Sequence, residues 1–159
     1  PSRMFQIIGI VLLFATVFGS YLWSGGNMAV IMHALPHEML AIGGDYNIAP
    51  NDKDVHDPRA WHGSVLTDDA VRKAYRKIIH LGLASAMDPV PYCPTKKGGQ
   101  YSWWDYRGGA FDQDNGLLID HVLLSPQAAD RLTGCAINKA PRELEKPSDH
   151  TPVIANLNI

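Results

Sequence analysis

The strongest constraint on the fold is an uncharged apolar run near the start of the chain. Phe5 to Trp23 reads FQIIGIVLLFATVFGSYLW, and no Lys, Arg, Asp or Glu occurs between Arg3 and Glu38. As an α-helix this run would be roughly 28 Å long, close to the ~30 Å hydrocarbon core of a bilayer. A signal peptide and a buried helix of a soluble protein are the alternatives, although no A-x-A cleavage site follows the run. The length of the run favours a membrane-spanning helix.

After Asp45 the composition is that of an ordinary soluble domain. The 159 residues are enough for one hydrophobic core, and 14 basic against 16 acidic residues give a net charge of −2. This balance does not indicate a nucleic-acid-binding protein, but a local basic cluster could still bind DNA. Cys93 and Cys135 lie far apart without a C-x-x-C motif, so a reducing compartment is the default expectation.

Apolar periodicity predicts an α/β or α+β fold from about residue 39 onward. One helix should follow Thr67 as N-cap, carry a mostly apolar face from Val71 to Ile79, and end at Gly82. The polar, proline-containing segment 49–63 should be a loop. Strands are predicted for MLAIGG, YSWWDY, GLLIDHVLLS and PVIANLNI.

Polar residues at the predicted strand ends are candidates for chemistry. Asp45 and Asn47 follow the first of these strands in a G-D-x-N motif, and in an extended chain both would point the same way. The carboxylate could orient or deprotonate a water molecule, and the amide could hold a phosphate oxygen. A purely structural turn is the alternative, because Asp and Asn are common turn residues.

A second candidate is Asp120, which lies in a strongly apolar strand. Burying an unpaired carboxylate is costly, so a histidine, a basic residue or a metal is expected beside it, unless the strand end is exposed. His121 points to the opposite face. His150, which follows Asp149 just before the last strand, could pair with Asp120 if their strands meet.

The aromatic segment YSWWDYRGGAF could contact nucleotides. Trp103, Tyr106 and Arg107 suit base or sugar stacking and phosphate contact, although a strand with one core tryptophan is the alternative. Pro36 interrupts any helix that would present His33 and His37 together, and no zinc-type motif occurs.

The motifs GDYNIAP, YSWWDYR, GLLIDHVLLS and EKPSDHTPV, in this order, resemble the C-terminal half of the exonuclease III family from roughly Gly43 to the C-terminus. These proteins are abasic-site endonucleases and 3′-exonucleases of the endonuclease/exonuclease/phosphatase superfamily. The resemblance implies an α/β fold that is an incomplete half of a two-sheet sandwich. It also implies DNA as the substrate, with Mg²⁺ or Mn²⁺ as cofactor.

The same resemblance implies residue roles. Asp45 would orient or activate the attacking water and Asn47 would hold the phosphate. His150, paired with Asp120, would stabilise charge on the phosphoryl group, with Asp149 near the metal ion. Trp103, Tyr106 and Arg107 would face the DNA.

The N-terminal half of that family's site has no counterpart in the sequence. An early Asn, a metal-binding Glu in a Gln-Glu motif and a catalytic Tyr are expected, but Glu38 is the only carboxylate before Gly43. The half-sheet that would close the sandwich is also expected to be missing. We therefore expect weak metal binding and little or no activity.

Residues Met4 to Gly44 resemble a different family, the proton-channel subunit MotA of the flagellar motor stator. The pattern GSYLWSGG…LPHEML.IGG carries this resemblance, which covers MotA's first membrane helix and the approach to its second. It implies a stator-like leader over residues 1–41 and a nuclease half over 42–159, joined from two unrelated gene pieces. Pro1 in place of Met fits a fragment, and Met4 fits the stator's natural start.

The expected location follows from the two parts. A nuclease half belongs in the cytoplasm, with membrane association possible through residues 5–23. Arg3 before the span weakly favours a cytoplasmic N-terminus, which would instead put the nuclease half outside. A stator-type membrane fragment and a nonfunctional chimeric product are the alternatives, and the oligomeric state is open.

Overall fold

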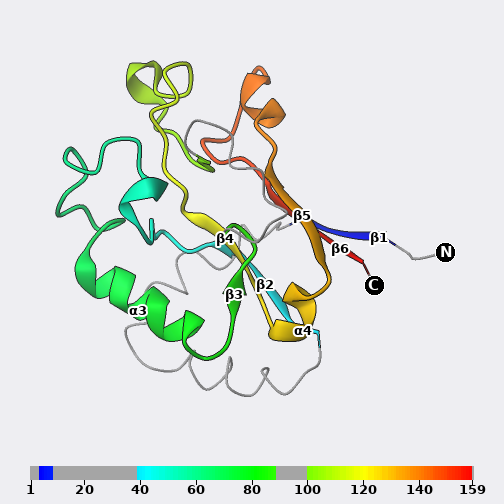
Figure 1. Cartoon of the computed structure of the whole chain (residues 1–159). Helices are drawn as coiled ribbons and strands as arrows, with labels where there is room; N and C mark the ends of the chain where they lie inside the picture. The colour runs from blue at the N-terminus through cyan, green and yellow to red at the C-terminus, as the bar shows by residue number, and fades with distance from the viewer. Residues whose placement is uncertain (1–3, 9–38, 89–99, 159) are drawn as a thin grey trace.

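Two antiparallel sheets form the framework of the chain (Figure 1). The structure is a computed structural model and describes residues 4–8, 39–88 and 100–158. One sheet has the order β1-β6-β5, from Met4–Ile8, Val153–Asn158 and Leu132–Ile137. The other has the order β2-β4-β3, from Ala41–Asp45, Asp120–Leu124 and Ala84–Ser85. The predicted class, an α/β fold with sheets, is therefore correct.

The main core lies between the two sheets. Val122 and Leu124 of β4 pack in one cluster with Val153, Ala155 and Leu157 of β6. The spacing of two in both strands is the one expected when one face of a strand is buried. The short helix α4 (Pro126–Ala129) adds Ala128 to this cluster, and the Ser125 hydroxyl caps that helix by accepting the amide of Ala128.

Helix α3 (Asp69–Ile79) packs on the far side of the β2-β4-β3 sheet. Its Tyr75 and Ile78 contact Leu123, which points away from the inter-sheet core. The predicted helix is confirmed, but its N-cap is Asp68, whose side chain accepts the amide of Ala70. The Thr67 hydroxyl lies one residue before this cap and donates to the carbonyl of Trp61 in the preceding loop.

Residues 101–106 do not form the predicted strand. Trp103 alone makes isolated bridges, to Leu117 and to His150. The fully buried Trp104 ring packs closely on the backbone at Gly116, where an added Cβ would lie 2.5 Å from the indole nitrogen. This aromatic packing within a loop overrides the strand propensity of the segment.

Two other expectations differ from the structure. The strand predicted from GLLIDHVLLS is limited to Asp120–Leu124, and β5 was not anticipated. Strand β5 contains Gly134 and a register shift between Leu132 and Gly134, which weaken its alternating pattern. Short 3-10 turns occur at Asp52–Asp54 (η1), Arg107–Gly109 (η2) and Ala140–Glu143 (η3).

The predicted transmembrane helix is not found where the structure describes the chain. Its first residues, Phe5–Ile8, lie in β1 and pair with β6, for example Phe5 with Leu157. A short apolar run can form either a strand or a helix. Here the edge of β6 is available for pairing, and the run forms a strand along it. Residues 9–23 of the predicted span lie outside the described ranges. Within those ranges no helix has the length and apolarity needed to cross a membrane.

Candidate active site

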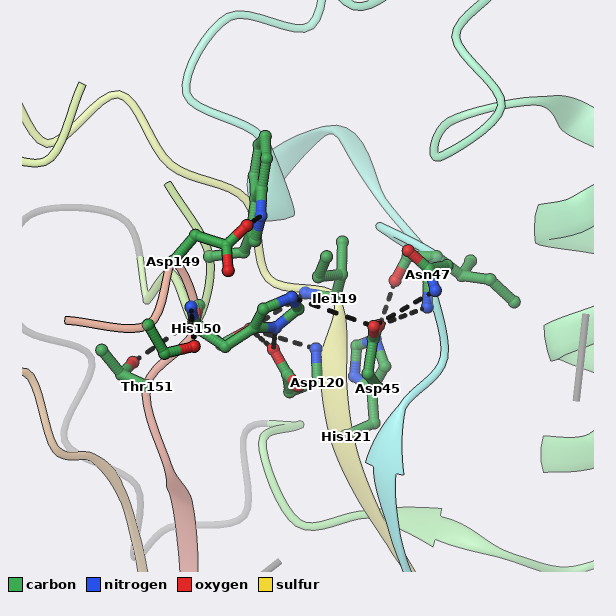
Figure 2. Close-up of polar contacts among 12 residues, drawn as sticks. Asp45, Asn47, Ile119, Asp120, His121, Asp149, His150 and Thr151 are labelled. Atoms are coloured by element: carbon green, nitrogen blue, oxygen red, sulfur yellow. Dashed lines mark hydrogen bonds and ion pairs between the residues drawn. The ribbon is translucent and has the colours of Figure 1, made fainter. Parts of the chain in front are cut away.

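A carboxylate–imidazole cluster lies where β2 ends and β4 begins (Figure 2). Asp45 and Asp120 are paired in register across these strands. His150 enters the cluster from the loop before β6, with Nδ1 at 2.9 Å from Asp120 Oδ2 and Nε2 at 3.9 Å from Asp45 Oδ2. The imidazole therefore lies between two carboxylates that belong to neighbouring strands.

Ser102 holds the Asp120 carboxylate in place. This serine is fully buried, and its hydroxyl donates to Asp120 Oδ2 at 2.6 Å. The Ser102 hydroxyl oxygen accepts the backbone amides of Ile119 and Asp120 at 3.2 and 3.0 Å. Ser102 was not among the predicted site residues, because a single serine in an aromatic segment belongs to no motif.

The charges around His150 favour its protonated form. Burial by itself would lower the pKa of His150, but the hydrogen bond and charge of Asp120, with the charges of Asp45 and Asp149, outweigh it and raise the pKa. Burial raises the pKa of Asp45, and the charges of Asp120 and Asp149 add to this. The backbone amide of Asn47 and the charge of His150 act in the opposite direction. In this cluster both the His150 imidazole and the Asp45 carboxylate therefore hold a proton more readily than the free groups do.

Asn47 contacts Asp45 through a turn and not through an extended chain. Its φ of 52° is in the left-handed region. Its backbone amide donates to Asp45 Oδ1 at 2.8 Å and its side-chain amide to Asp45 Oδ2 at 3.1 Å. The extended geometry expected for these two residues is wrong, and an Asx-type turn brings them together instead. Asn47 is solvent-exposed.

Asp149 directs its carboxylate to Trp103. The indole Nε1 of Trp103 donates to Asp149 Oδ2 at 2.9 Å, and the ring meets Trp61 edge-to-face with centroids 5.9 Å apart. Trp104 is fully buried, whereas Trp103 is partly exposed. Of the two tryptophans, Trp103 is therefore the one at the site.

Tyr106 and Arg107 lie in the loop that contains η2, and both are already engaged. The Tyr106 hydroxyl donates to the carbonyl of Pro147 at 3.0 Å, although 61 % of the residue is exposed. Arg107 donates from Nη2 to Asp105 Oδ2 at 2.8 Å and from Nε to Asp105 Oδ1 at 3.1 Å. The side-chain and backbone hydrogen bonds from Arg107 lower the pKa of Asp105 to about 2. Contact between Arg107 and a phosphate would have to compete with this ion pair.

The donors of the cluster partly fit a divalent cation. Within the described residues, one set of carboxylate and imidazole groups could hold a metal: Asp45, Asp120 and His150, with ligand atoms all within 4.8 Å of one another. Mg²⁺ prefers oxygen ligands, so the two carboxylates fit it. The His150 imidazole is better placed to stabilise negative charge than to bind the cation, because its Nδ1 is hydrogen-bonded to Asp120. Asp149, the residue predicted to bind metal, is not in this set, because its carboxylate is turned to Trp103.

Comparison with known proteins supports the endonuclease/exonuclease/phosphatase superfamily as the class of this fold and site. The predicted resemblance to the exonuclease III family is confirmed. Exodeoxyribonuclease III of Haemophilus influenzae is 35% identical over 124 residues, covering 73% of this chain and 45% of that protein. Exodeoxyribonuclease of Bacillus subtilis is 26% identical over 137 residues, covering 86% of this chain and 52% of that protein.

Solved structures of exonucleases and AP endonucleases also match this chain. The 3′-5′ exonuclease NExo from Neisseria meningitidis matches with a TM-score of 0.76 and 34% identity, covering 89% of this chain and 52% of that chain. An AP endonuclease from Archaeoglobus fulgidus matches with a TM-score of 0.75 and 29% identity, covering 89% and 55%. The chain spans about half the length of the curated relatives it matches.

The second predicted resemblance is also confirmed. Residues 7–49 match the family model described as "Motility protein A N-terminal". This match extends past Asp45 and Asn47, so it includes both residues of the G-D-x-N motif at the end of β2. The residues of the candidate site from Trp103 onward lie outside it.

Proposed function

We propose that residues 42–159 carry the chemistry of a metal-dependent DNA phosphodiesterase of the abasic-site endonuclease and 3′-exonuclease type. The observation that carries this proposal is the position of His150 between Asp120 and Asp45. Similarity to exodeoxyribonucleases and AP endonucleases supports DNA as the substrate. A stator-like leader over residues 1–41 from an unrelated gene is part of the same proposal, supported by the match over 7–49.

Each residue of the cluster has a task in hydrolysis of a phosphodiester. Asp45, with its raised pKa, orients a water molecule and accepts its proton. Asn47 fixes the Asp45 carboxylate through two hydrogen bonds and, being exposed, can turn its amide towards a phosphate oxygen. Protonated His150 stabilises charge that develops on the phosphoryl group, and Asp120 keeps the imidazole oriented.

A divalent cation is required by the charge of the site. The carboxylates of Asp45, Asp120 and Asp149 outnumber the one imidazolium, so without a cation the site would repel a phosphate. Mg²⁺ or Mn²⁺ bound here would neutralise that charge and polarise the phosphoryl oxygens. Carboxylate oxygens of Asp45 and Asp120 would hold the ion, with Asp149 close by; the Trp103 hydrogen bond limits Asp149 to its other oxygen.

We propose that this activity is weak. The early Asn, the metal-binding Glu and the catalytic Tyr of the resembled family have no counterpart before Gly43. A cation held by fewer carboxylates binds less tightly and is positioned less well, which lowers turnover.

The decisive experiment uses the full chain and a duplex with one abasic site, with and without Mg²⁺. We expect slow cleavage that requires Mg²⁺, disappears in His150→Ala and persists in His62→Ala, an exposed histidine in the 51–67 loop. Rapid cleavage dependent on His150 would refute the weak activity. Absence of both cleavage and Mg²⁺-dependent binding of the duplex would refute the nuclease function.

A membrane fragment of the stator type is the second candidate, favoured by the match over residues 7–49. The pairing of residues 4–8 with β6 argues against it at the start of the run. Fractionation of cells expressing the full chain separates the two. We expect recovery with the cytoplasmic fraction, whereas retention in the membrane pellet after an alkaline carbonate wash would favour the membrane fragment.

A further inference from the structure

The backbone that presents Asp149 and His150 is held at two consecutive carbonyl groups. The Tyr106 hydroxyl donates to the carbonyl of Pro147 at 3.0 Å. The Arg142 Nη1 donates to the carbonyl of Ser148. The amide of His150 in turn donates to the Ser148 hydroxyl at 3.1 Å. The turn that leads into the catalytic cluster is therefore fixed from outside by two side chains.

Arg142 is an unusual residue to find in this place. It lies in η3 with only 8 % of its surface exposed, and its Nε is buried without a hydrogen-bond partner in the described part of the chain. No carboxylate forms an ion pair with it among the residues that the structure describes. Burying a guanidinium without a counter-charge costs free energy. A residue that only filled space at this position could be apolar and would avoid that cost.

Two aromatic rings partly offset that cost. The Arg142 guanidinium lies 5.3 Å from the centre of the Tyr106 ring and 5.0 Å from the centre of the Phe111 ring. Cation–π contacts of this kind are stabilising and suit the planar guanidinium in particular. Arg142 thus joins the loop of residues 106–111 to the 147–148 segment, and Tyr106 contacts both Arg142 and that segment.

We propose that Arg142 and Tyr106 form a clamp, defined by these two side chains and the carbonyls of Pro147 and Ser148, that positions His150 against Asp120. Both are positioning residues, because they act through the backbone of the 147–150 turn. The clamp also gives Tyr106 a task different from nucleotide stacking. Because Tyr106 neighbours Arg107, DNA bound at the 106–111 loop would tighten the same turn; this last consequence rests on the proposed nuclease function.

The test needs neither DNA nor activity. In the ¹⁵N-labelled full chain at fixed pH, the imidazole signals of His150 report the hydrogen bond of Nδ1 to Asp120, and they are assigned by their absence in His150→Gln. We expect Tyr106→Phe and Arg142→Gln to shift these signals while those of the buried His121 stay in place. Arg142→Lys should not restore them, because an ammonium cannot stack between two rings and donate in plane.

Arg131→Gln is the matched control. Arg131 is an exposed arginine that also donates to a backbone carbonyl, that of Asn158 at 3.4 Å, at the opposite end of β6 from His150. We expect no change in the His150 signals in this variant. If Arg142→Gln does not fold, Tyr106→Phe decides, because it removes one hydroxyl from a residue that is 61 % exposed.

Unchanged His150 signals in folded Tyr106→Phe would overturn the clamp. A shift of these signals in Tyr106→Phe that is no larger than the shift in Arg131→Gln would overturn it as well. Neither result changes what the cleavage assay with the abasic duplex measures. The imidazole signals can likewise be measured whether or not the chain cleaves DNA. The clamp and the nuclease function can therefore fail separately.

Discussion

Replacing Ser102 by alanine removes the support of the site without touching a group that would contact substrate. The hydroxyl donates to Asp120 at 2.6 Å and accepts two backbone amides, those of Ile119 and Asp120. A hydrogen bond to a charged group contributes ~1.5–3 kcal/mol, and leaving a buried amide without an acceptor costs ~1–3 kcal/mol. Local rearrangement, and water entering beside Asp120, whose side chain is 17% exposed, recover part of this. We expect Ser102→Ala to lower the free energy of unfolding by roughly 2–4 kcal/mol.

Urea unfolding followed by tryptophan fluorescence measures the effect. The midpoint should fall while the m-value stays constant, because the surface exposed on unfolding does not change. Ser64→Ala is the control, since the Ser64 hydroxyl accepts the amide of Leu66 at 3.3 Å within a turn, and a loss of at most about 1 kcal/mol is expected. A Ser102→Ala midpoint within error of that of Ser64→Ala would show that Ser102 does not support Asp120.

Three further predictions concern the surroundings of the cluster. Trp103→Phe removes the indole donor to Asp149 and should lower the free energy of unfolding by about 1–2 kcal/mol in the same urea assay; an unchanged midpoint would mean that the hydrogen bond contributes nothing. Because its pKa is raised on folding, His150 contributes stability that is complete below its unfolded pKa of about 6.5 and is lost as pH rises through the folded value. The unfolding midpoint of the wild type should therefore exceed that of His150→Gln most at about pH 6 and least at high pH, and a gap that grows with pH would contradict this. Gly116→Ala would place a Cβ 2.5 Å from a buried indole nitrogen and should lower the free energy of unfolding by about 1–3 kcal/mol in thermal unfolding. Gly134→Ala is the control and should lower it less, because the nearest atom to its added Cβ lies at 3.8 Å. Equal losses of stability in the two variants would refute the close approach at Gly116.

Local patterns in the sequence predicted several elements correctly. The apolar face of α3 and the last strand β6 were readable from spacing, because side chains on one face recur at fixed intervals. The strand before Asp45 was predicted from its short apolar run. The opposite directions of Asp120 and His121 followed from the same rule: the His121 ring is buried and contacts the carbonyl of Ile48, whereas Asp120 contacts Ser102 and His150.

Patterns failed where distant contacts decide the local structure. The aromatic segment 101–106 reads as a strand, but Trp104 is buried against Gly116 and only Trp103 forms a bridge. Phe5–Ile8 reads as the start of a helix, but the free edge of β6 takes it as a strand. In both cases the partner lies far away in the sequence, so no local window contains the information.

The sequence by itself determined the order of the motifs and was enough to predict the candidate site residues within them. It did not determine that Asp45 faces Asp120 in register or that His150 reaches both. Nor did it show that Ser102 and Arg142 hold them. Strand register and the packing of a turn against a loop depend on contacts between elements that are distant in the sequence. Hydrogen-bond chains of this kind are specified by three-dimensional proximity, and single serines and arginines carry no periodic signal. The candidate residues were therefore readable from the chain, and only the tertiary structure made them one site.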